Sequence, residues 1–70
     1  MEYNIMMEAE VLTNEGDHLM VRDVHGMEVL VHTPEKTAVR PGDRVYIRYD
    51  GAMTRSLPPQ IVAGSVEVLH

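Results

Sequence analysis

Arg44, Tyr46 and Arg48 follow one another at two-residue spacing and carry the side chains most suited to binding chemistry. In a β-strand, residues at this spacing point to the same face. Arginine planes and an aromatic ring on one face can stack on nucleic-acid bases and contact phosphates. The same arginines can instead pair with Glu8 and Glu10 on a neighbouring strand, where opposite charges contribute about 0.2–1 kcal/mol. The sequence favours pairing and leaves both interpretations open.

A second group of polar residues lies in the connection that follows Tyr49. Asp50-Gly51 indicates a turn, and the prolines at positions 58 and 59 are incompatible with the interior of a sheet. Polar loop residues held by prolines suit ligand binding, whereas hydroxyl and amide groups there can also bond the backbone. The candidate binding residues of this connection are Met53, Thr54, Arg55, Ser56 and Gln60.

His18, His25 and His32 recur every seven residues. If the segments containing His18 and His32 are adjacent strands, these two side chains are neighbours and resemble the beginning of a zinc site. A third or fourth ligand at suitable spacing is missing, and the chain has no cysteine for a thiolate ligand or a disulfide. We therefore expect ordinary surface histidines, no metal and no cofactor.

The sequence contains no recognisable catalytic group. Ser56 and Ser65 lack the context of a nucleophile elbow, and no glycine-rich phosphate loop is present. Paired carboxylates would need a cleft, which a domain of this size rarely has. We therefore expect a protein that is not an enzyme.

The charges are segregated along the chain. Residues 1–35 contain eight acidic residues and one arginine, whereas residues 36–55 contain five basic and two acidic residues. This distribution indicates either pairing of acidic with basic strands or a basic face on an acidic body. The net charge of −5 argues against general binding to nucleic acid or anionic membranes. No apolar run approaches the roughly 18 residues of a membrane span, and the N-terminus lacks the features of a signal peptide, so we expect a cytoplasmic protein.

Alternating hydrophobicity predicts five strands, at residues 3–12, 18–23, 27–32, 44–49 and 61–69. Turns are expected at 14–17, 24–26 and 40–43, the last as a type II turn with Pro41 and Gly42 at its centre. A single helical turn over 35–39, capped by Thr33, fits the longest connection. In the last strand Val62, Val66 and Val68 share one parity, and Gly64 indicates a bulge or a close strand contact.

These elements predict an all-β fold with one domain spanning residues 1–70. Its architecture is expected to be a five-stranded antiparallel OB-like barrel with at most one helical turn between the third and fourth strands. An SH3-like barrel is the alternative, and the long first strand favours the OB type. The six methionines, with no Phe or Trp, are adaptable core fillers, which leaves open a dimer that shares a core.

The segment Tyr49 to Ala63, with its Tyr-Asp-Gly turn and its Ser-Leu-Pro-Pro-Gln run, resembles the closing motif of small bacterial domains of the YobA type. As in those domains, a Gly-Asp turn, here Gly42-Asp43, opens the preceding strand. The similarity extends from Pro41 to Ala63, about a third of the chain. It implies an OB-like barrel and transfers no reaction and no binding residue.

The expected function is therefore binding or interaction. The favoured partner is a protein, including a second copy of the chain, contacted through outward methionines such as Met6 and Met20. The alternative is single-stranded nucleic acid on the face formed by Arg44, Tyr46, Arg48 and Arg55. A small anionic molecule at the connection between the last two strands is a third hypothesis.

Overall fold

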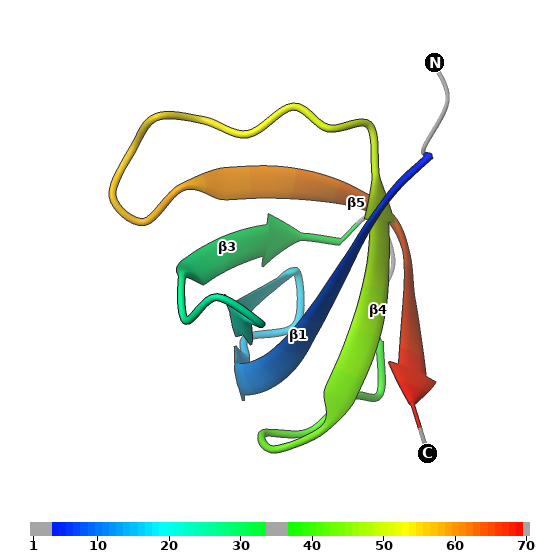
Figure 1. Ribbon diagram of the computed structural model, residues 1–70. Helices are drawn as coiled ribbons and strands as arrows, with labels where there is room; N and C mark the ends of the chain where they lie inside the picture. Colours follow the sequence, from blue (N-terminus) through cyan, green and yellow to red (C-terminus); the bar gives the residue numbers. More distant parts are fainter. Residues whose placement is uncertain (1–3, 34–36, 70) are drawn as a thin grey trace.

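The computed structural model describes residues 4–33 and 37–69, and these residues form five β-strands and no helix. The strands are β1 (Ile5–Asn14), β2 (His18–Asp23), β3 (Glu28–His32), β4 (Arg44–Tyr49) and β5 (Gln60–Leu69) (Figure 1). The all-β prediction is confirmed, with β2 and β4 at their predicted bounds. None of the described residues belongs to a helix able to cross a lipid bilayer.

The five strands form one closed sheet in the order β1-β2-β3-β5-β4, with β4 returning to β1. β3 and β5 pair in parallel, with Leu30 opposite Gln60, Val31 opposite Ile61 and His32 opposite Val62. The prediction of a fully antiparallel barrel is therefore wrong. An odd number of strands cannot alternate in direction around a closed ring, so one adjacent pair has to be parallel. That pair is the shortest one and completes the ring.

The ten-residue strand β1 pairs with two neighbouring strands. Its first half, from Ile5 to Glu10, pairs with β4, and its second half, from Ala9 to Asn14, pairs with β2. The register slips between Val11 and Thr13, which leaves Leu12 as an extra residue in β1. Such a bulge increases local bending and twist, which suits a strand that closes a small barrel.

Apart from Tyr49, the core is aliphatic, and it lies inside the ring. It consists of alternate residues from all five strands, together with Val39 from the connection between β3 and β4. Its members are Ala9, Val11, Leu19, Val21, Val29, Val31, Val39, Val45, Ile47, Tyr49, Ile61 and Ala63. The alternating hydrophobicity that predicted β2, β3 and β4 therefore corresponds to an apolar face of each strand inside the ring. Ile5 has the same parity as Ala9 and Val11, but it is 46% exposed and lies at the first position of β1.

Val62, Val66 and Val68 of β5 have the same parity, but they do not lie on the same face of the strand. Arg48 lies opposite Ser65 and Tyr49 opposite Ala63, so Gly64 has no partner on β4 and forms a bulge. Before the bulge, Ile61 and Ala63 are buried and Val62 is 56% exposed; after it, the even-numbered Val66 and Val68 pack against the core. The extra residue exchanges the two faces of the strand, since side chains alternate with period two. The bulge predicted at Gly64 is thus present, and it explains the change of parity.

The connection between β3 and β4 contains the predicted turn at residues 40–43. Gly42 has a φ of +94°, and the Asp43 amide donates to the Arg40 carbonyl at 3.0 Å. The turn is held against β1 because the Gly42 amide donates to Val11 O, and the Val11 amide to Asp43 O, both at 2.8 Å. The predicted helical turn lies partly at residues 34–36, outside the described residues, and residues 37–40 contain no helix.

Gly51, directly after β4, has a φ of +92°, and a Cβ there would lie 3.3 Å from Ile5 Cγ1. We expect Gly51→Ala to lower the free energy of unfolding by about 1–2 kcal/mol, the cost of this conformation for an L-residue. Gly16→Ala is the control, since Gly16 has a φ of +97° and open space around it. Chemical denaturation should show similar losses for the two variants, because the half-exposed Ile5 can move. A loss more than 1 kcal/mol larger for Gly51→Ala would mean that Ile5 is fixed.

Candidate binding hollow

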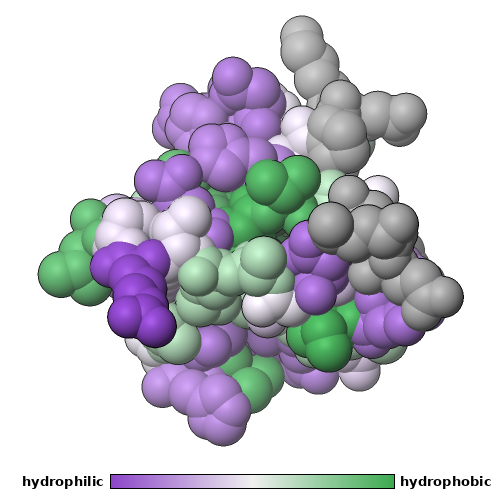
Figure 2. Space-filling view, turned by 90° about the horizontal axis from the view of Figure 1, so that it is seen from above, coloured by the Kyte–Doolittle hydropathy of each residue, from purple (hydrophilic) through white to green (hydrophobic). Residues whose placement is uncertain are grey.

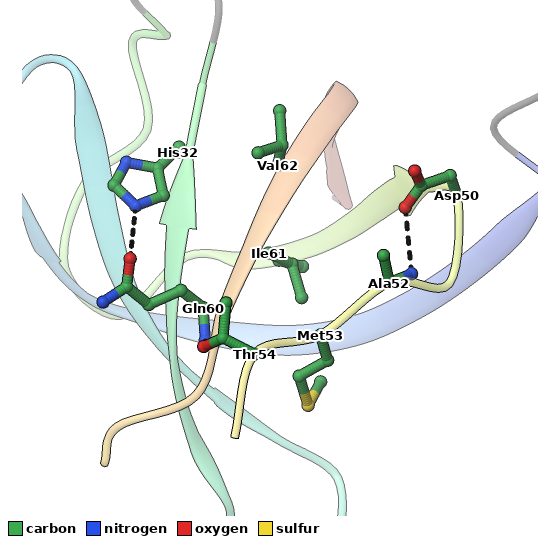
Figure 3. A pocket seen from close by; sticks show the side chains of 8 residues that line it. All are labelled: His32, Asp50, Ala52, Met53, Thr54, Gln60, Ile61 and Val62. Atoms are coloured by element: carbon green, nitrogen blue, oxygen red, sulfur yellow. Dashed lines mark hydrogen bonds between the residues drawn. The ribbon is translucent and has the colours of Figure 1, made fainter. Parts of the chain in front are cut away.

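A hollow of about 320 Å³ opens beside the parallel contact of β3 with β5. Three parts of the chain line it: the end of β3, the start of β5 and the connection that follows β4. Its residues are His32, Asp50, Ala52, Met53, Thr54, Gln60, Ile61 and Val62. Figure 3 shows His32 and Gln60 on one side, Asp50 and Ala52 on the other, and Ile61 and Val62 of β5 between them.

The hollow combines apolar surface with a few polar groups at its rim. Ile61 is buried beneath it, Met53 is half-buried and packs against the core, and Val62 is exposed. At the rim, His32 Nε2 lies 2.8 Å from Gln60 Oε1, and Asp50 Oδ1 accepts from the Ala52 amide at 2.9 Å. Small-ligand sites generally have this composition, in which apolar walls supply affinity and a few polar groups supply orientation.

Hydrogen bonds fix the connection that borders the hollow. The Thr54 amide donates to Gln60 O at 3.0 Å, and the Gln60 amide donates to Thr54 Oγ1 at 2.9 Å. The Thr54 and Ser56 hydroxyls lie 2.6 Å apart, and Ser56 Oγ donates to Pro58 O at 2.8 Å. The hydroxyls of Thr54 and Ser56 therefore support the backbone, as one of the two interpretations of this segment requires.

The structure brings only some of the candidate loop residues to the hollow. Met53, Thr54 and Gln60 line it, whereas Arg55 and Ser56 are exposed outside its lining. Sequence reasoning missed five of its residues: His32, Asp50, Ala52, Ile61 and Val62. The pairing of β3 with β5 was the missing information, because it places His32 beside Gln60 across 28 residues of sequence.

The predicted arginine face on β4 is partly neutralised. Arg44 Nη1 donates to Glu8 Oε2 at 3.1 Å, which realises one of the expected ion pairs. Tyr46 lies between Glu8 and Glu67 of the two neighbouring strands. Arg48 lies between Met6 and Ser65, and among the described residues it forms no ion pair. None of the three β4 residues lines the hollow.

His18 and His32 are cross-strand neighbours, as the sequence suggested, with ring centroids 6.4 Å apart. His25 belongs to the turn between β2 and β3. The hydrogen bond from His18 and the charge of its ring when protonated lower the pKa of the Asp17 carboxyl below its ordinary value. Over residues 4–33 and 37–69, no three or more His, Asp or Glu side chains are grouped to hold a metal ion.

Comparison of the chain with protein families, with curated proteins and with solved structures found no match in any of the three.

Proposed function

We propose that this protein is a non-enzymatic binding module of the OB type that contacts a protein partner through the hollow beside β3 and β5. The observation that carries the proposal is the combination of Ile61, Val62 and Met53 with a polar rim at His32 and Gln60. An apolar side chain of a partner would fill the hollow, and the rim would bond its backbone. The cytoplasmic location expected from the sequence stays a prediction.

Two observations support the OB type. The chain forms a three-stranded meander, a longer connection and then two further strands, and its long first strand is shared by both halves of the ring. OB folds bind ligands beside the loop between strands 4 and 5, and here that loop, residues 50–59, borders the hollow. The proposed resemblance to YobA-type domains covers Pro41 to Ala63, a segment that supplies every lining residue except His32.

A protein partner is favoured over nucleic acid by the distribution of charge. The net charge is −5, Arg44 is paired with Glu8, and Tyr46 has a glutamate on both sides in the register. Single-stranded nucleic acid needs a continuous basic groove with stacking aromatic rings. It remains the second candidate, because Arg48 and Arg55 form no ion pair with any described residue.

The exposed apolar side chains also bear on the choice of partner. On the face seen in Figure 2, apolar residues lie in several separate places among polar residues, not as one continuous patch. Of the methionines expected to point outward, Met6 is 47% exposed and Met20 is half-buried. A small hollow that takes one or two side chains fits this surface better than a broad apolar interface. Sedimentation at two concentrations distinguishes a second copy of the chain from a different protein as the partner.

Capped amino acids test the hollow directly. We expect N-acetyl-leucine methylamide at millimolar concentration to shift the NMR signals of Ile61, Val62 and Thr54, because these residues lie in the hollow. Val62→Glu should weaken this binding at least about tenfold by placing a carboxylate in the apolar wall. Val24→Glu is the matched control: Val24 is 62% exposed and Val62 is 56% exposed, but Val24 does not line the hollow.

Other results of these experiments would contradict binding in the hollow. If the capped leucine shifts no hollow residue, or if both glutamate variants weaken binding alike, the hollow is not the binding site. If a single-stranded oligonucleotide instead shifts Tyr46 and Arg48 with an affinity that falls steeply with salt, the nucleic-acid alternative takes the place of the protein partner.

A further inference from the structure

We propose that His18 of β2 and His32 of β3 together bind one divalent transition-metal ion, such as Zn²⁺ or Ni²⁺. The two residues lie directly opposite each other in the antiparallel register, and their ring planes are inclined at 53°. The proposal depends only on these two rings and their hydrogen-bond partners. His32 and Gln60 also belong to the rim of the hollow, so the metal site shares two residues with the proposed protein-binding site, and the two proposals are tested with different ligands.

The backbone pairing brings the two side chains close together. The Thr33 amide donates to Asp17 O at 3.1 Å. This backbone hydrogen bond joins the residue after His32 to the residue before His18, so His18 and His32 themselves exchange no backbone hydrogen bond. They are consequently a non-hydrogen-bonded pair, the arrangement in which facing side chains of an antiparallel ladder are closest. Two imidazoles that face each other across adjacent strands can act as the two arms of a chelate.

Each ring has one nitrogen held by an oxygen that only accepts hydrogen bonds. His18 Nδ1 lies 2.7 Å from the Asp17 carboxylate oxygen Oδ1, and His32 Nε2 lies 2.8 Å from the amide oxygen Gln60 Oε1. Each of these nitrogens must therefore carry the hydrogen, which leaves His18 Nε2 and His32 Nδ1 with free lone pairs in the neutral rings. Metal-binding histidines are usually oriented by such partners on their second nitrogen.

The separation of the rings is compatible with one ion between them. Zinc–nitrogen bonds are about 2.0–2.1 Å, so two imidazoles on a tetrahedral ion have centroids about 5 Å apart. The observed centroid distance is 6.4 Å, so the rings have to rotate toward each other to share one ion, and both side chains are at least partly exposed. Water would complete the coordination, and imidazole ligands suit zinc, copper and nickel. The site lacks the third protein ligand of a structural zinc centre, so its affinity is expected to be modest.

Nickel titration of the full chain, followed by NMR of the histidine ring protons, tests the proposal. Paramagnetic Ni²⁺ should broaden the signals of His18 and His32 at lower concentrations than those of His25. Zinc calorimetry should give one ion per chain. His18→Gln and His32→Gln should each weaken binding at least about tenfold, because either change removes one arm of a chelate. His25→Gln and His70→Gln are controls, expected to change the affinity less than twofold.

Two results would overturn the proposal. The first is broadening of His25 or His70 at the same nickel concentration as His18 and His32, which would mean independent surface histidines. The second is a double variant, His18→Gln with His32→Gln, whose loss of metal-binding free energy equals the sum of the losses of the two single variants. A chelate predicts instead that the first substitution removes most of the affinity and the second adds little.

Discussion

Leu19→Ala is expected to lower the free energy of unfolding by about 2–5 kcal/mol, the range for removing a fully buried leucine side chain. Leu19 of β2 is 0% exposed and is among the largest fully buried side chains of the barrel. At about 0.05–0.15 kcal/mol per residue, a domain of this length has a total stability of roughly 4–10 kcal/mol. The variant should therefore lose a large part of its stability, measured by urea denaturation with circular dichroism.

Leu57→Ala is the matched control for this prediction. The chemical change is the same, but Leu57 lies in the connection before β5 and is 96% exposed. We expect its effect to stay within about 0.5 kcal/mol. Equal effects of the two substitutions would contradict the assignment of Leu19 to the inside of the ring and of Leu57 to its outside.

Asn14→Ala is expected to lower the free energy of unfolding by about 2 kcal/mol or more, because it removes three hydrogen bonds worth about 0.5–1.5 kcal/mol each. Asn14 Nδ2 donates to Thr37 O at 3.1 Å and to Val39 O at 2.9 Å. Its Oδ1 accepts from the Gly16 amide at 2.9 Å. This one side chain thus joins the end of β1, the turn after it and the connection that carries Val39 into the core. Chemical denaturation measures the loss.

Asn14→Asp separates the two roles of the amide. Aspartate keeps an acceptor for the Gly16 amide, but it has no donor and faces two carbonyl oxygens. We therefore expect Asn14→Asp to be at least as destabilising as Asn14→Ala, with Gly16 still protected from hydrogen exchange. An aspartate variant as stable as the original chain would show that the bonds to residues 37 and 39 contribute nothing.

The strands were predictable because each is bounded by turn residues and alternates with period two. Arg44 to Tyr49 is the clearest case, with three inward residues that are all buried. Period two fails where the backbone gains a residue, and a bulge cannot be located from parity alone. Gly64 was recognised as a possible bulge, but its effect on Val62 needed the register between β4 and β5.

The candidate site was only partly predictable, because it depends on the pairing of residues far apart in the chain. The loop residues Met53, Thr54 and Gln60 were proposed from their chemistry, and in the structure they line the hollow. His32 and Val62 contribute through the parallel pairing of β3 with β5. Local sequence has no signal for this pairing, although the odd number of strands in a closed ring requires one parallel contact.

The parallel contact of β3 with β5 closes the sheet and forms one wall of the hollow, so both the fold and the candidate site depend on it. Nuclear Overhauser contacts between the backbone protons of Leu30–His32 and Gln60–Val62 test it most directly. We predict inter-strand contacts in a parallel register that places Val31 beside Ile61. If these contacts are absent, and if the β3 amides that face β5 exchange with solvent as fast as the amides of exposed turns, the closed ring and the hollow are both contradicted.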